Sequence, residues 1–104
     1  ELQVGCIEAG PFDVVVQATP LGMAHGEHPN ESPWQVLGMD PQSCMATQSL
    51  ALETIYDPIE TPFVNIMLQA GVKVLTGQDM WLAQASGQLD AWCGYQPPPE
   101  VWKL

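Results

Sequence analysis

The chain has no arginine and only two lysines, Lys73 and Lys103, against twelve acidic residues. Its formal net charge at pH 7 is −10. A surface of this sign should repel nucleic acid and anionic membranes, so we expect neither as a partner. Without a guanidinium group, any bound phosphate must be held by backbone amides or by residues outside this chain.

Cysteine is scarce and scattered, and no Cys-x-x-Cys pair or cysteine–histidine cluster occurs among the three cysteines. His25 and His28 lie in a polar loop without a third ligand in register, which favours solvated histidines. We therefore expect no metal site, and free thiols in a reducing cytosol. No export leader and no apolar run of membrane-spanning length is visible, which favours a cytoplasmic location.

What the chain does contain is three short apolar segments, each ended by turn-forming residues. The run of three valines in residues 14–17 predicts a strand buried on both faces, and Pro20 ends it. Residues 50–56 and 72–75 predict two more strands, which end at Asp57-Pro58 and Thr76-Gly77. Residues 1–11 suggest a short strand or turn that leads into the first of these strands.

Helix signals alternate with the predicted strands. Ser-Pro and Thr-Pro pairs mark two helix starts, and glycines mark the stops. We expect helices near residues 34–37, 62–70 and 79–93, with residues 39–49 irregular and a last short turn at 101–104. On the last helix, one stripe should belong to the core, namely Trp81, Ala85, Leu89 and Trp92. The adjacent stripe is small or polar and consists of Met80, Gln84, Gly87 and Ala91.

The alternation of strands and helices in 104 residues predicts one domain of the α/β class, with about three parallel strands and flanking helices. Ligands of such sheets bind at the carboxyl ends of the strands, which predicts one shared cleft. The glycine-rich dinucleotide motif, Gly-x-Gly-x-x-Gly, is absent, as is the ribose-reading residue that follows it. Either the protein does not bind a dinucleotide, or the chain is the second half of a Rossmann-like domain.

Three motifs resemble shikimate dehydrogenases in order and spacing: Ala18-Thr-Pro-Leu-Gly-Met23, Tyr56-Asp-Pro-Ile-Glu-Thr-Pro62 and Gly77-Gln-Asp-Met-Trp-Leu-Ala-Gln-Ala85. The closing Trp92-Cys-Gly94 is also similar to the family's last helix end. The resemblance implies an enzyme that reduces 3-dehydroshikimate to shikimate with NADPH, in aromatic amino-acid biosynthesis. It places residues 1–104 in the C-terminal part of the NADP-binding domain. The glycine-rich loop and the N-terminal substrate domain would then lie outside this chain.

The same resemblance assigns residue roles. It implies that the Tyr56 hydroxyl and the Gln84 amide contact the substrate, shikimate or quinate. The positions that it implies along the cofactor are Ala18, Thr19, Pro20, Thr54, Ile55, Gly77 and Met80. The family's catalytic lysine and aspartate belong to the N-terminal domain, so this chain should contain no catalytic residue and should be inactive alone.

Four positions depart from the family pattern. Gln17 stands where the family usually has Asn, and Asp57 stands where it often has Asn or another polar residue. Thr54 stands where the family usually has an apolar residue, and an aspartate at position 79 is unusual. A carboxylate of Asp79 near the nicotinamide would favour the oxidised, cationic ring. Two alternatives stay open, an NAD-dependent quinate/shikimate dehydrogenase and a non-catalytic nucleotide-binding or interaction module. If the first half of the sheet is missing, the strand at 14–17 has an unpaired edge, which predicts self-association or dependence on a partner segment.

Overall fold

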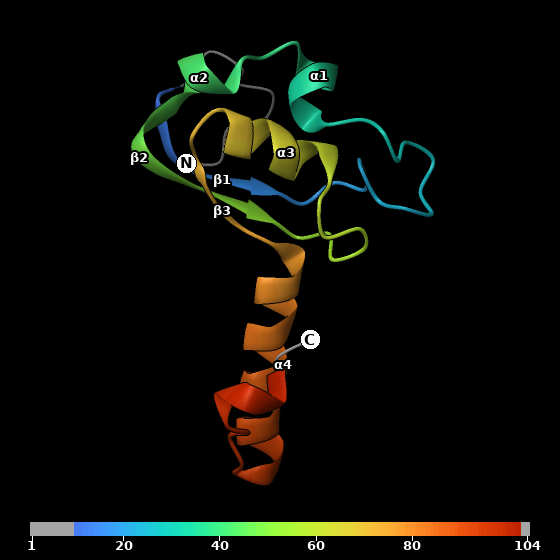
Figure 1. Ribbon diagram of the computed structural model, residues 1–104, viewed down its shortest axis with the longest axis vertical. Coiled ribbons are helices and arrows are strands. Elements are labelled where there is room, and N and C mark those ends of the chain that lie inside the picture. The colour runs from blue at the N-terminus through green and yellow to red at the C-terminus, as the bar shows by residue number, and fades with distance from the viewer. Residues whose placement is uncertain (1–9, 103–104) are drawn as a thin grey trace, which may run out of the picture.

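The computed structural model describes residues 10–102, so most of the lead-in expected at residues 1–11 lies outside the described residues. Three strands form one sheet in the order β1-β2-β3, namely β1 (Phe12–Gln17), β2 (Met45–Glu53) and β3 (Lys73–Leu75). Both neighbouring pairs are parallel (Figure 1). The predicted parallel α/β architecture is therefore confirmed.

Three helices lie along one face of the sheet (Figure 1): α1 (Pro33–Leu37), α2 (Pro41–Cys44) and α3 (Pro62–Gln69). Each begins at a proline preceded by a side-chain cap, because proline suits the first helical position and the cap satisfies a free backbone N–H group. The core lies between these helices and β2 and consists of Trp34, Ala51, Phe63, Met67 and Val72.

The opposite face of the sheet is open in the part of the chain that the structure describes. Val14 and Val16 are 55% and 53% exposed. They pair in register with Leu50 and Leu52 of β2, so one apolar surface spans both strands. The prediction that the valine strand is buried on both faces is wrong for this chain, because a doubly wound sheet needs helices on both faces and only one face is covered here.

The strand at 50–56 also needs correction at both ends. Strand β2 begins at Met45, directly after α2, so residues 39–49 are not irregular as predicted. It ends at Glu53, so residues 54–56 lie in the loop beyond it. Propensity missed the early start because the segment at 45–49 is polar and small. The segment is joined to β1 at its first residue, where Met45 pairs with Phe12, and the register then shifts so that Val14 pairs with Leu50.

The last helix, α4 (Gly77–Cys93), projects away from the sheet (Figure 1). Its predicted core stripe is wrong for this chain, since Trp92 is 77% exposed and Gly77 is the helix's only buried residue. The radius of gyration is 15.6 Å, against roughly 13 Å for a compact domain of this length. The amphipathic pattern identifies a face for packing, but residues 10–102 supply nothing that covers it.

The tail after α4 turns back alongside it. A short 3-10 helix, η1 (Pro99–Trp102), contributes to a shallow pocket that joins the tail to α4 and is lined by Leu82, Ala83, Ser86, Pro97, Pro99 and Trp102. The expected short terminal turn is therefore present, slightly earlier than predicted. Within residues 10–102, no helix combines the length and the apolar character that crossing a membrane requires.

Candidate functional site

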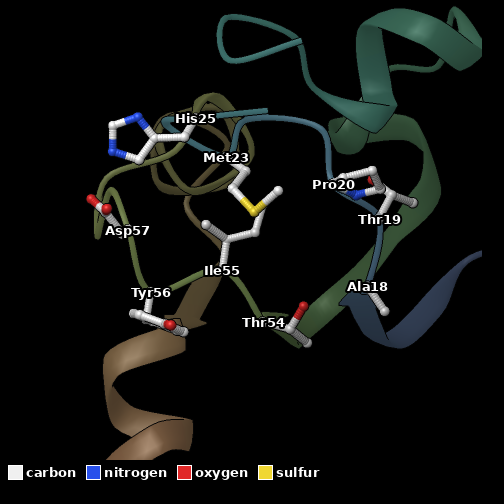
Figure 2. Close-up of a pocket in the computed structure, with 9 residues that line it drawn as sticks. All are labelled: Ala18, Thr19, Pro20, Met23, His25, Thr54, Ile55, Tyr56 and Asp57. Atoms are coloured by element: carbon white, nitrogen blue, oxygen red, sulfur yellow. The ribbon is translucent and has the colours of Figure 1, made fainter. Parts of the chain in front are cut away.

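A cavity of about 470 Å³ opens where β1 and β2 end (Figure 2). Its lining consists of Ala18, Thr19, Pro20, Met23, His25, Thr54, Ile55, Tyr56 and Asp57. Six of the nine residues to which the sequence analysis assigned binding roles are among them. The two strand exits thus share one cleft, as expected for the carboxyl edge of a parallel sheet.

The exit of β1 is shaped by Gln17, whose side chain is buried. Its Oε1 accepts a hydrogen bond from the Thr19 amide at 2.6 Å, and its Nε2 donates to the carbonyl oxygens of Thr19 and Leu21 at 3.1 and 3.0 Å. The amide therefore satisfies backbone groups of the loop that it encloses. A residue with both a donor and an acceptor is needed here, which explains how Gln17 can occupy a position where the family usually has Asn.

The two strand exits are tied together by Thr54. Its backbone N–H donates to the Gln17 carbonyl oxygen at 3.1 Å, and its hydroxyl donates to the same oxygen at 2.8 Å. The hydroxyl of Thr54 is thus engaged with the backbone. The polar departure at this position has a structural reason, since the hydroxyl links β1 to β2.

A second link joins the loops farther from the strands. The backbone N–H of Ala24 donates to the carbonyl oxygen of Asp57 at 3.1 Å. This hydrogen bond brings the loop after β1 beside the loop after β2, and it places His25 and Asp57 on the same side of the cavity (Figure 2). The sequence analysis assigned no binding role to Met23, His25 or Asp57. Met23 and Asp57 stood inside quoted motifs, but His25 is brought to the cavity by a contact that spacing does not reveal.

The start of α4 packs directly beneath the exit of β2. A Cβ atom added at Gly77 would overlap the carbonyl group of Ile55 and would lie 2.7 Å from the Tyr56 amide nitrogen. The backbone of Gly77 therefore packs against Ile55, a residue that lines the cavity, although Gly77 itself does not line it. Glycine is required here for close approach rather than for an unusual backbone angle.

Asp79 serves as a cap for the same helix. Its Oδ2 accepts hydrogen bonds from the backbone N–H and the hydroxyl of Thr76, both at 2.8 Å, in a reciprocal capping box. Asp79 is not among the residues that line the cavity. Its carboxylate stabilises the start of α4.

Tyr56 lies between the main cavity and α4. Its ring centroid is 6.5 Å from that of Trp81, and the two residues share a smaller pocket with Ile59 and Gln78. Gln84 is exposed and follows Trp81 by about one helical turn. Neither Met80 nor Gln84 lines either of these two pockets. Both residues belong to α4, the helix whose Trp81 lies beside Tyr56.

The cavity has an apolar wall and a polar side. Ala18, Pro20, Met23 and Ile55 supply apolar surface. The side chains of His25, Tyr56 and Asp57 make no hydrogen bond within residues 10–102, whereas the threonine hydroxyls are already engaged. In the described part of the chain, no lysine lines the cavity. This arrangement suits a flat ring against the wall and a hydroxylated ligand at the polar side.

The parallel three-stranded sheet and its flanking helices define the second half of a Rossmann-like α/β fold, with a cleft at the strand ends. A scan against family models found no match. The NADP-dependent shikimate dehydrogenase of Archaeoglobus fulgidus is 35% identical over 94 residues, which are 90% of this chain and 32% of that enzyme. That of Syntrophobacter fumaroxidans is 38% identical over 89 residues, 86% of this chain and 28% of the enzyme.

Solved structures agree with the sequence relatives. The shikimate dehydrogenase of Thermus thermophilus, in complex with NADP(H) and shikimate, has a TM-score of 0.66 and is 28% identical, covering 86% of this chain and 31% of that one. A shikimate dehydrogenase-like protein, HI0607, superposes with a TM-score of 0.75 at 22% identity over 95% of this chain and 35% of its own, which supports the Rossmann-like fold. Over most of its own length the chain matches one segment of these shikimate dehydrogenases, and it spans about a third of the length of the curated relatives that it matches.

Proposed function

We propose that this chain is the C-terminal part of the NADP-binding domain of a shikimate dehydrogenase, which reduces 3-dehydroshikimate to shikimate. The observation that supports this most is the shared cavity at the ends of β1 and β2, lined by six residues that family resemblance assigns to ligands. The relatives in sequence are NADP-dependent shikimate dehydrogenases. A cytoplasmic location belongs to the same proposal.

In this proposal the nicotinamide ring lies against the apolar wall. Ala18, Thr19 and Pro20 flank it from the exit of β1, and Thr54 and Ile55 flank it from the exit of β2. Bound NADPH supplies the hydride, and the protein orients the ring and excludes water. The close approach of the Gly77 backbone to Ile55 supports the proposed role of the Gly77 carbonyl oxygen, which is to hold the carboxamide. Met80, on the first turn of α4, is the remaining proposed contact with the ring.

The substrate would lie at the polar side of the cavity. The Tyr56 hydroxyl makes no hydrogen bond within the described residues, so it is available to a substrate hydroxyl. Gln84 would reach the substrate from the exposed face of α4. Proton transfer to the new hydroxyl belongs to a lysine and an aspartate outside this chain, and no lysine among residues 10–102 lines the cavity.

The test uses the complete protein, by which we mean this chain joined to the N-terminal portion that its relatives carry. Shikimate-dependent reduction of NADP⁺ should appear with the complete protein and should be absent with residues 1–104 alone. Absence of this activity from a folded complete protein, with either cofactor and with shikimate or quinate, would reject the enzyme function and leave the non-catalytic module.

One observation favours a second candidate. The quinate dehydrogenase of Corynebacterium glutamicum, in complex with NAD, has a TM-score of 0.61 and is 27% identical over 86% of this chain. The residue that reads the adenosine ribose is not in this chain, so cofactor choice lies outside it. The ratio of kcat/KM for shikimate with NADP⁺ to that for quinate with NAD⁺ separates the two enzymes.

A further inference from the structure

Few contacts of its own side chain hold Tyr56 in position. Its side chain is 61% exposed, and it makes no side-chain hydrogen bond within residues 10–102. Trp81 is its one aromatic neighbour there, with the rings tilted by 31° at a centroid distance of 6.5 Å. The direction in which its hydroxyl points is therefore set mainly by the backbone that carries it.

That backbone is held by Glu53, the last residue of β2, which is fully buried. Its Oε1 accepts a hydrogen bond from the Ile55 amide at 2.9 Å. Its Oε2 accepts one from the Thr61 hydroxyl at 2.6 Å. One side chain thus fixes both ends of the loop at 54–60, which contains Tyr56.

The contact with Thr61 also connects this loop to α3. Thr61 is the N-cap of α3, and its Oγ1 accepts a hydrogen bond from the Val64 amide at 3.2 Å. Two donors converge on Glu53, and a carboxylate has two oxygens to accept them. A glutamine places an NH2 group where one of these two oxygens stands, so it keeps at most one of the two bonds, and either the Ile55 amide or the Thr61 hydroxyl loses its acceptor.

We propose that Glu53 is a positioning residue for substrate binding, which acts through Ile55 and Thr61 to hold the Tyr56 hydroxyl at the polar side of the cavity. The proposal rests on the proposed function for the role of Tyr56 itself. It adds that a residue with no exposed surface, and with no contact to the cavity, controls how well the substrate is bound.

The experiment compares variants in the complete protein. Thr61→Val removes the hydroxyl that donates a hydrogen bond to Glu53, while Thr61→Ser retains this hydroxyl. Glu53→Gln removes one of the two acceptors. Ser32→Ala is the matched control, because Ser32 is a buried N-cap of α1 whose hydroxyl accepts from Trp34 and which does not line the cavity. Its loss should lower thermal stability without moving Tyr56.

We expect Thr61→Val and Glu53→Gln to raise the KM for shikimate about tenfold, with the KM for NADP⁺ little changed. Thr61→Ser and Ser32→Ala should leave the shikimate KM near its original value. In a Tyr56→Phe background the Thr61→Val and Glu53→Gln effects should largely vanish, because residues that act through one contact are not additive. Fully additive effects would overturn the proposal, and so would an unchanged shikimate KM in Thr61→Val.

A second measurement does not depend on catalysis. In the complete protein labelled with 3-fluorotyrosine, the ¹⁹F resonance that Tyr56→Phe removes belongs to Tyr56. Thr61→Val should shift or broaden this resonance, whereas Thr61→Ser and Ser32→Ala should not. An unmoved resonance overturns the positioning role. If Tyr56→Phe leaves the shikimate KM unchanged while Thr61→Val still moves the resonance, the substrate role of Tyr56 fails and the positioning of the loop stands.

Discussion

The backbone of Gly77 lies so close to the carbonyl group of Ile55 that a methyl group at position 77 would overlap it. This contact joins the start of α4 to the exit of β2, which are more than twenty residues apart in the sequence. It places the helix that carries Gln84 beside the loop that carries Tyr56. The geometry of the proposed site therefore depends on one residue without a side chain.

Gly77→Ala should destabilise the protein by on the order of 1–3 kcal/mol, because the added methyl group forces α4 away from Ile55. In the complete protein it should also raise the KM for NADP⁺. The matched control is Gly87→Ala on the same helix, where an added Cβ meets no atom within 4 Å. That change should stabilise the protein by roughly 0.5–1 kcal/mol. Thermal and urea unfolding measure the stability change of each variant. Equal changes for Gly77→Ala and Gly87→Ala would contradict the close contact between Gly77 and Ile55.

Tyr56→Phe and Gln84→Ala should each weaken shikimate binding in the complete protein, by roughly 1–3 kcal/mol per lost hydrogen bond. Both variants should fold normally, since both side chains are exposed. Gln88→Ala, on the exposed surface one turn farther along α4, serves as the control and should leave the kinetics unchanged. Steady-state kinetics with shikimate varied at saturating cofactor provide the measurement. Wild-type kinetics in both variants would contradict the substrate roles of Tyr56 and Gln84.

Thr54→Val should lower the free energy of unfolding by about 0.5–1.5 kcal/mol, because it removes the hydroxyl that donates to the Gln17 carbonyl oxygen. The KM for NADP⁺ should hardly change, since valine offers the nicotinamide a similar apolar surface. Thr54→Ser keeps the hydroxyl and should retain the stability that this hydrogen bond contributes. Urea unfolding of the three proteins checks this, and a large rise in the NADP⁺ KM for Thr54→Val would show that the hydroxyl faces the cofactor.

Residues 1–104 alone should self-associate. Strand β1 is at the edge of the described sheet, and its Val14 and Val16 are exposed on the open face. Exposed strand edges and apolar sheet faces favour association. Val16→Lys should shift the isolated chain toward the monomer in sedimentation velocity. Val36→Lys is the control, since Val36 is equally exposed but lies on α1. A monomeric wild-type chain at high concentration would contradict the prediction.

The sequence was sufficient for the order of the three strands and of α1, α3 and α4, because the signals for these are local, but it missed α2. The proline pairs and their caps at residues 32–33 and 61–62 start helices, and glycines such as Gly94 stop them. The parallel sheet follows from that order. Residues 18–20 and 54–56 could be placed at one cleft for the same reason, since the strand ends of a parallel sheet meet at one edge.

Local signals were insufficient where the outcome depends on what packs against a segment. The polar start of β2 extends a strand that pairs with β1 at Met45 and again from Leu50, and the valines of β1 are open on one side because nothing in the described chain covers that face. The apolar stripe of α4 is exposed for the same reason. His25 reaches the cavity through a single backbone hydrogen bond between two loops.

Outside residues 39–49, the sequence by itself determined the kinds of element, their order and the motifs at the strand ends, since each follows from residues a few positions apart. Only the tertiary structure decided that Glu53 and Thr61 are joined, that Gly77 lies against Ile55, and which surfaces remain open. These relationships require residues from different elements to meet in space. Their energies come from burial and from paired donors and acceptors, which spacing along a chain does not encode.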